Sequence, residues 1–213
     1  LLLRRTLDEL TELIDKSKQL YPKAFPGATF RESKSTWNFP SGATLWFTYL
    51  EKDRDVTRFQ GQSFAWIGID EITQYPSPYV WDYLRSRLRT TDAELTNNLS
   101  MRCTANPGGV GGWWVKKMYI DAAEHNHTFA ATDLDTGKPL TYPAGHDKEG
   151  EPLFYRRFIP ARLTDNPYLM ADGQYEAMLL SLPEVERKRL LDGDWDVAEG
   201  AAFPEFSRTR HVV

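Results

Sequence analysis

The first fifty residues carry apolar and polar positions in a pattern that predicts a strand, a helix and a hairpin. Residues 1–4 begin with three leucines, which predicts the end of a buried strand. Thr6 and Glu9 form a Thr-x-x-Glu capping box, and apolar residues then recur at helical spacing. We expect this helix to stop before Pro22, because proline disrupts helical hydrogen bonding.

Two short β segments and a returning strand follow the helix. Residues 29–32 and 35–39 are typical of strands, and the turn residues at 40–42 lead into a third strand at 43–49. Residues 64–69 are a continuous apolar run of strand length, which indicates a strand buried on both faces of a parallel sheet.

The elements that follow alternate between helix and strand. We expect a helix at 79–88, a strand at 99–104 and a helix near 113–120. This alternation predicts an α/β fold with a mostly parallel sheet flanked by helices.

The pattern changes after residue 128. The segment 133–152 is rich in glycine and proline and predicts a hairpin with a long surface loop, followed by a strand at 153–160. Asn166-Pro167 predicts a helix start with proline at the first position, and residues 168–182 and 183–191 predict a helical pair.

Composition bears on three questions, which are nucleic-acid binding, disulfide bonds and membrane spans. The formal net charge is -4, so overall charge gives no support to nucleic-acid binding, although a local basic patch remains compatible with it. Cys103 is the only cysteine, which excludes an internal disulfide and fits a reducing compartment. No apolar run approaches the roughly 20 residues of a membrane span, so we expect no membrane partner.

The clearest chemical signal is the acid pair Asp70-Glu71 directly after the apolar run 64–69. Open α/β sheets bind ligands at the carboxyl ends of their strands, where this pair is expected to lie. In nucleotide hydrolases the first such acid holds Mg²⁺ and the second polarises the attacking water. The alternative is that the two acids only cap the following turn.

A second signal lies at the end of the strand predicted at 99–104. Thr104 and Asn106 stand there, just before a Pro-Gly break. A hydroxyl and an amide at that place could sense the γ-phosphate of a nucleotide. The alternative is a plain turn, because Asn-Pro-Gly is favourable turn chemistry.

Together the two signals match P-loop ATPases of the additional-strand, RecA-like type, in which a sensor strand lies beside the strand of the acid pair. Several strings then resemble the large subunit of bacteriophage terminases over nearly the whole chain. They are Arg-Phe-Gln-Gly at 58–61, Leu-Arg-Ser-Arg-Leu-Arg at 84–89, Thr-Ala-Asn-Pro at 104–107, Leu-Thr-Asp-Asn-Pro-Tyr-Leu at 163–169, Leu-Leu-Asp-Gly-Asp-Trp at 190–195 and Ala-Phe-Pro-Glu-Phe at 202–206.

The resemblance implies ATP and Mg²⁺ as cofactors and a role for each signal residue. Asp70 would coordinate Mg²⁺ and Glu71 would be the catalytic carboxylate. Thr104 and Asn106 would contact the nucleotide and form the motif that couples hydrolysis to movement of DNA.

Basic residues extend this prediction. Arg58 would stabilise transition-state charge, within its own subunit or in a neighbour, and the alternative is a surface ion pair with Asp53 or Asp55. Three arginines of the helix expected at 79–88 and just after it could meet DNA phosphates, although a solvated helix face is the simpler interpretation. They are Arg85, Arg87 and Arg89.

The resemblance also implies a domain plan and a setting. Residues 1–125 would be a partial P-loop ATPase core from its second strand onward, 126–200 a hairpin plus helical lid or linker subdomain of α+β type, and 201–213 the start of a link to a nuclease domain. The protein would work in the host cell cytoplasm as a ring of identical subunits. Its partners would be double-stranded DNA, the portal protein and the small terminase subunit.

The phosphate-binding string Gly-x-x-x-x-Gly-Lys-[Ser/Thr] of this class is not found in the 213 residues. The glycine-rich stretch 108–112 precedes Lys116 and Lys117, but its spacing does not fit. We expect the phosphate-binding loop and its strand to precede Leu1, beside the strand at 99–104, whose edge would then lie open. Glu205 and His211 are not assigned as nuclease ligands.

The missing string leads us to expect little or no ATP hydrolysis by this polypeptide alone. Two other classes remain open. One is a truncated or decayed, inactive terminase fragment. The other is a helicase-like P-loop ATPase, which would need a second RecA-like domain that 213 residues cannot hold.

Overall fold

The computed structural model describes residues 1–171 and 173–197. It divides into two compact units, Leu1–Ala105 and a second that begins at Asn106, and each is described by itself. The domain boundaries expected at residues 125 and 200 stay a prediction. The string at 202–206, Glu205 and His211 lie outside the described residues.

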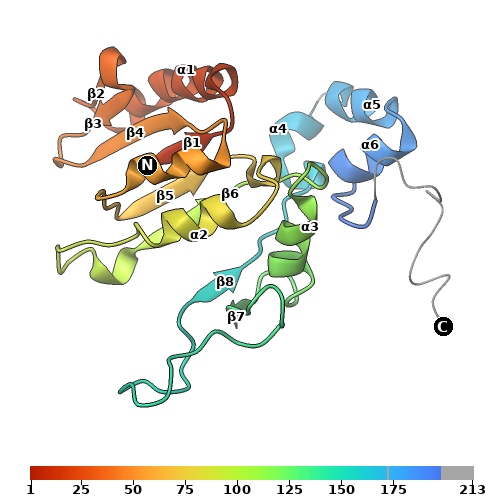
Figure 1. Cartoon of the computed structure of the whole chain (residues 1–213). Helices are drawn as coiled ribbons and strands as arrows, with labels where there is room; N and C mark the ends of the chain where they lie inside the picture. Colours follow the sequence, from red (N-terminus) through yellow and green to blue (C-terminus); the bar gives the residue numbers. More distant parts are fainter. Residues whose placement is uncertain (172, 198–213) are drawn as a thin grey trace, which may run out of the picture. The chain divides into compact units, whose positions relative to one another are not determined.

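The first unit is built on a six-stranded sheet with the order β2-β3-β4-β1-β5-β6 (Figure 1). Strands β4, β1, β5 and β6 run parallel, and β2 and β3 add an antiparallel hairpin beside β4. The mostly parallel α/β sheet predicted from the apolar runs is therefore confirmed. The strands are β1 Leu2–Arg4, β2 Thr29–Arg31, β3 Thr36–Asn38, β4 Thr44–Tyr49, β5 Trp66–Ile69 and β6 Ser100–Cys103.

Helical segments cover both faces of this sheet. Strand β4 contacts helical segments on both faces, because successive side chains of a strand point to opposite faces. Phe47 packs with Leu10 of α1 in a buried cluster, whereas the neighbouring Trp46 meets the ring of Phe59 in η2, with ring centroids 5.6 Å apart. The helical segments of this unit are α1 Leu7–Ala24, η1 Glu32–Lys34, η2 Asp53–Phe59, η3 Ile72–Gln74, α2 Tyr79–Arg85 and η4 Thr96–Asn98.

The start of α1 is as predicted, but its end is not. Thr6 caps the helix in a complete capping box with Glu9. The helix nevertheless continues through Pro22 to Ala24, so the expectation that it stops before the proline was wrong. Aromatic packing explains the extra turn, because Tyr21 and Phe25 both meet the ring of Phe39, at 5.8 and 5.2 Å between centroids. Tertiary contacts thus outweigh the lost backbone hydrogen bond.

Strand β6 ends the sheet order, and in the part of the chain that the structure describes it pairs only with β5. Arg102 and Cys103 on this strand are exposed. In the described residues the other side of β6 therefore has no partner strand, and the strand expected beside it stays a prediction.

Gly68 in the middle of β5 offers a direct test of this packing. A Cβ built there would lie 2.7 Å from Leu2 Cδ1 and would overlap the ring of Trp66. We expect Gly68→Ala to lower the free energy of unfolding by about 1–3 kcal/mol, measured by chemical denaturation, because overpacking displaces neighbours. Gly112→Ala is the matched control, since a Cβ there has nothing within 4 Å beyond its chain neighbours and the backbone of its own helix, and an equal loss in both variants would contradict this account.

The second unit combines a small antiparallel sheet with short helices. Strands β7 Thr128–Ala130 and β8 Tyr155–Arg157 pair at the base of the long predicted hairpin loop. The helical segments are α3 Gly112–Val115, the π-helical η5 Lys116–Ile120, η6 Leu163–Asp165, α4 Pro167–Met170, α5 Gln174–Leu180 and α6 Glu184–Leu190.

The helix expected over 168–182 is two helices rather than one. Asn166 caps α4 and Pro167 begins it, as predicted, but α5 starts only at Gln174. Gly173 precedes α5 with a φ of 67°, a left-handed conformation that interrupts a helix and suits glycine. Among the described residues, no helix has both the length and the apolar character that crossing a membrane requires.

Candidate active site

The acid pair lies at the carboxyl edge of the parallel strands. Asp70 follows β5 directly, Arg4 ends the neighbouring β1, and Thr104 follows β6 on the other side. The backbone ties these ends together, since Asp70 N donates to Leu3 O at 2.9 Å and Ile72 N donates to Thr104 O at 2.9 Å. The fold thus gathers three strand ends at the place where open α/β sheets bind ligands.

Both carboxylate oxygens of Asp70 have a partner. Arg4 Nε donates to Oδ2 at 2.5 Å, and the hydroxyl of Thr104 donates to Oδ1. The side chains of Arg4 and Asp70 are 17% and 16% exposed, so the ion pair is mostly shielded from water. Asp70 is therefore held from both neighbouring strands.

Glu71 has an unusual backbone conformation, with φ 54° and ψ 56°. Its N–H donates to Thr104 Oγ1 at 2.9 Å. A non-glycine residue in the left-handed region costs on the order of 1–3 kcal/mol and persists where the surroundings enforce it, often at active sites. The hydroxyl of Thr104 thus links both acids of the pair.

Arg4 was not singled out in the sequence, yet it is part of a small polar network. Arg4 NH1 lies 3.9 Å from Glu9 Oε1, and Gln74 Nε2 donates to the same oxygen at 2.7 Å. Burial raises the pKa of Glu9, but the hydrogen bonds from Gln74 and Thr6 and the charge of Arg4 outweigh it and lower the pKa. The network keeps Glu9 ionised and so helps to fix Arg4 beside Asp70. The available sequence signal was a charged residue directly after an apolar strand.

Arg58 lies on η2 and contacts the end of β4. Its guanidinium donates to Thr48 Oγ1 at 2.7 Å and to the carbonyl of Tyr49, and it lies 5.0 Å from the centroid of the Phe59 ring. Its role at the transition state stays a prediction.

The alternative ion pairs of Arg58 do not form among the described residues. Asp53 pairs with Arg5 at 2.6 Å, and Asp55 lies 3.8 Å from Arg54. Arg58 therefore contacts neutral oxygen atoms of β4, an arrangement that can be exchanged for an anion at lower cost than a buried ion pair.

Asn106 is the first residue of the second unit, two positions after Thr104. Its part in the site stays a prediction. The three arginines considered for DNA contacts have local partners: Arg85 lies 3.5 Å from Asp82, Arg87 stacks over Tyr83, and Arg89 donates to Gln62 O. Contact with DNA would have to replace these interactions.

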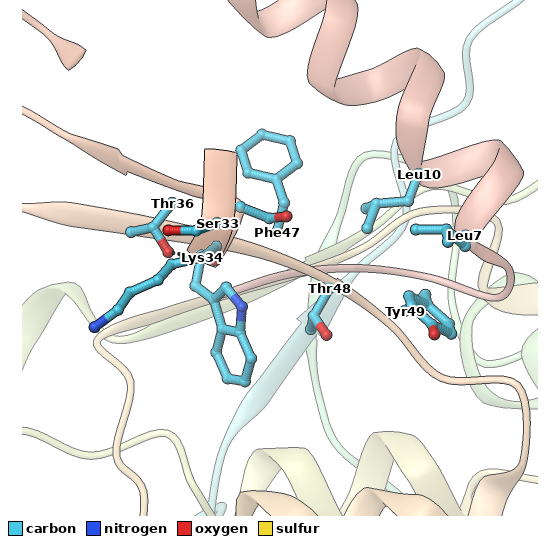
Figure 2. Close-up of a pocket in the computed structure, with 10 residues that line it drawn as sticks. Leu7, Leu10, Ser33, Lys34, Thr36, Phe47, Thr48 and Tyr49 are labelled. Atoms are coloured by element: carbon cyan, nitrogen blue, oxygen red, sulfur yellow. Dashed lines mark hydrogen bonds between the residues drawn. The ribbon is translucent and has the colours of Figure 1, made fainter. Parts of the chain in front are cut away.

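A cavity of about 510 Å³ lies in the first unit between α1, η1, β3 and β4 (Figure 2). Thr48 and Tyr49, the partners of Arg58, line it together with Lys34 and Trp46. None of its lining residues belongs to the acid pair, and we therefore do not assign it to a nucleotide.

The donor set at the strand ends suits a hard cation. Asp70 and Thr104 bring carboxylate and hydroxyl oxygens together there, which are ligands that Mg²⁺ prefers. Among the described residues no cluster of three or more His, Cys, Asp or Glu could hold a metal by itself.

The family model for terminase large subunits, T4likevirus-type, N-terminal, matches residues 3–210. The chain belongs to this terminase family. A comparison with curated proteins finds no match.

Solved terminases share the fold. The large terminase of a thermophilic bacteriophage, solved in complex with ADP, aligns with a TM-score of 0.62 and 16% identity, over 100% of this chain and 44% of that one. A second crystal form of the same phage protein gives 0.62 and 18% identity over the same shares. At these identities the likeness shows the fold alone, and the chain spans less than half the length of these relatives. It is a large-terminase ATPase domain by family, and its acid pair lies at the carboxyl edge of the parallel strands.

Proposed function

We propose that this terminase chain is the ATPase module of a DNA-packaging motor and that it works at the carboxyl edge of β5 and β6. The observation that carries the proposal is the hydroxyl of Thr104, which joins Asp70 and Glu71 across two neighbouring parallel strands. A loss of phosphate sensed at β6 would thereby reach the acid pair directly.

Each residue has a role in this proposal. Asp70 would hold Mg²⁺, which would neutralise charge on the phosphates. Glu71 orients and polarises the attacking water, and Arg4 balances the charge of Asp70. Thr104 and Asn106 contact the nucleotide and respond to the γ-phosphate, and Arg58 stabilises the transition state from its own or a neighbouring subunit.

The family supports the proposed nucleotide and partners. A large terminase of the same fold was solved with ADP, which supports an adenine nucleotide as ligand. We propose double-stranded DNA, the portal protein and the small terminase subunit as partners, with identical subunits forming a ring in the host cell cytoplasm.

The test compares the 213-residue chain with the complete protein. We expect Mg²⁺-dependent ATP hydrolysis and packaging of DNA into procapsids by the complete protein. The 213-residue chain should show little or none, because it holds no Gly-x-x-x-x-Gly-Lys-[Ser/Thr] string to cradle the phosphates.

Two results would count against these expectations. Turnover by the 213-residue chain that Glu71→Gln abolishes would show that the chain forms a working site by itself. A complete protein that neither hydrolyses ATP nor packages DNA would refute the motor assignment and favour a decayed fragment. Strand separation by the complete protein would instead favour a helicase-like ATPase.

A further inference from the structure

The loop that follows Asn106 is held by an arginine from the last described helix. Arg189 of α6 donates from Nε to the carbonyl of Pro107 at 2.9 Å, although the two residues are 82 positions apart in the sequence. Pro107 is buried, and both residues belong to the second unit. A charged donor on a carbonyl makes one of the stronger hydrogen bonds in proteins.

Gly108 lets the guanidinium of Arg189 lie directly on this loop. A Cβ built on Gly108 would overlap the guanidinium, and the φ of Gly108 is 95°, a region that side chains disfavour. The positive φ favours glycine at this position, and a Cβ there would displace the guanidinium of Arg189 from the loop. Pro107 and Gly108 therefore do not only form a turn. They also form the surface on which the guanidinium of Arg189 lies.

The chain just beyond α6 is attached to the same segment of the second unit at another place. Lys116 Nζ lies 3.2 Å from Asp196 and 2.6 Å from Asp121. Burial lowers the pKa of Lys116, but the hydrogen bonds to Asp121 and Asp196 outweigh it and raise the pKa. The residues that follow α6 thus have a second contact with the segment 107–121, through Lys116 and Asp196.

We infer that Arg189 is a positioning residue. Its contact with Pro107 holds the loop at Pro107 and Gly108 against α6, so that this loop couples the nucleotide site to α6. The inference rests on the proposed function and adds a part to it. Thr104 lies three positions before Pro107 in the chain. A shift of the segment 104–106 on loss of the γ-phosphate therefore reaches α6 through the guanidinium. Without this contact, the glycine-rich stretch 108–112 would change its own conformation and the shift would not reach α6.

The experiment measures the length of DNA packaged per ATP hydrolysed by the complete protein with procapsids. For Arg189→Ala we expect ATP hydrolysis within about twofold of wild type and about a tenfold lower DNA length per ATP, in the range of typical coupling effects. Arg187→Ala is the matched control, since it removes the same charge from the same helix two positions away and leaves the contact with Pro107 intact. This control should leave both quantities unchanged.

Gly108→Ala tests the same contact from the other side. Gly108→Ala should lower the DNA length per ATP when it is introduced into the wild-type protein. The same substitution should have a smaller effect in the Arg189→Ala variant. The strained φ is present in both proteins, but only the wild type has a guanidinium for the new Cβ to overlap. Arg189→Lys keeps the charge and one donor and should be intermediate. Thermal unfolding of each variant separates misfolding from uncoupling, and Arg189→Lys and Gly108→Ala keep the test valid if Arg189→Ala fails to fold.

Three outcomes would overturn the inference. Arg189→Ala could behave like Arg187→Ala, or it could lose hydrolysis and packaging in proportion, which would make Arg189 a general structural residue. The effects of Gly108→Ala and Arg189→Ala could also be fully additive. A wild-type protein that does not package DNA would refute the proposed function itself and this inference with it.

Discussion

Replacing Glu71 by glutamine in the complete protein should lower ATP hydrolysis by about 10²–10⁴-fold, the usual contribution of a positioned base. The amide has nearly the same shape but cannot polarise the attacking water. The backbone N–H that Glu71 donates to Thr104 is retained, so the strand ends should stay joined. Steady-state release of phosphate gives the rate, and titration with ATP should show binding within a few-fold of wild type.

The control for this variant is Glu51→Gln, which removes an exposed carboxylate of the same unit. It should leave the rate unchanged. If Glu71→Gln hydrolysed ATP at a rate close to that of Glu51→Gln, the assignment of Glu71 as the catalytic carboxylate would be wrong. A parallel loss of ATP binding would place Glu71 in binding rather than in the chemical step.

Replacing Arg58 by alanine should lower ATP hydrolysis by about 10³-fold, the lower end of the range for arginines that stabilise a transferring phosphoryl group. In the structure the guanidinium contacts neutral oxygens of Thr48 and Tyr49, so no carboxylate competes with a phosphate for it in these contacts. Arg58→Lys should recover only part of the rate, because an ammonium lacks the planar fork. Arg54→Ala on the same η2 segment is the control, since Arg54 is 80% exposed.

Mixing two inactive variants decides between action within a subunit and action on a neighbour. If Arg58 serves a neighbouring site, a mixed ring of Arg58→Ala and Glu71→Gln subunits recovers hydrolysis, because some sites combine an intact Glu71 with an intact Arg58. If Arg58 serves its own subunit, no recovery follows. If Arg58 only braces β4, Arg58→Ala lowers the thermal midpoint and reduces hydrolysis only in step with the folded fraction.

The parallel core of the fold could be predicted because its strands are short apolar runs, and β5 is the clearest of them. Two predicted helix boundaries were wrong, because tertiary contacts set one of them and the backbone conformation of a glycine set the other. Aromatic contacts carry α1 past Pro22, and the left-handed Gly173 separates α4 from α5. The spacing of apolar residues predicts which segments are helical, but it does not predict which packing contacts compensate for a proline inside a helix.

The candidate site was predictable only where its residues follow strands directly. Asp70, Glu71 and Thr104 met that condition, and the structure joins them by hydrogen bonds. Arg4 was not found, because its contact with Asp70 joins residues 66 positions apart. The contact of Arg189 with Pro107 spans 82 positions and depends on a glycine conformation that no sequence pattern reports.

The outer side of β6 has a practical consequence for anyone who purifies this polypeptide. In the described residues its amide and carbonyl groups on that side have no partner strand, and such groups are a template for an incoming strand. The positive charge of Arg102 on this strand opposes self-association. A strand from a second copy pairs with these groups only when molecules are crowded, so pairing between copies at β6 should rise with protein concentration.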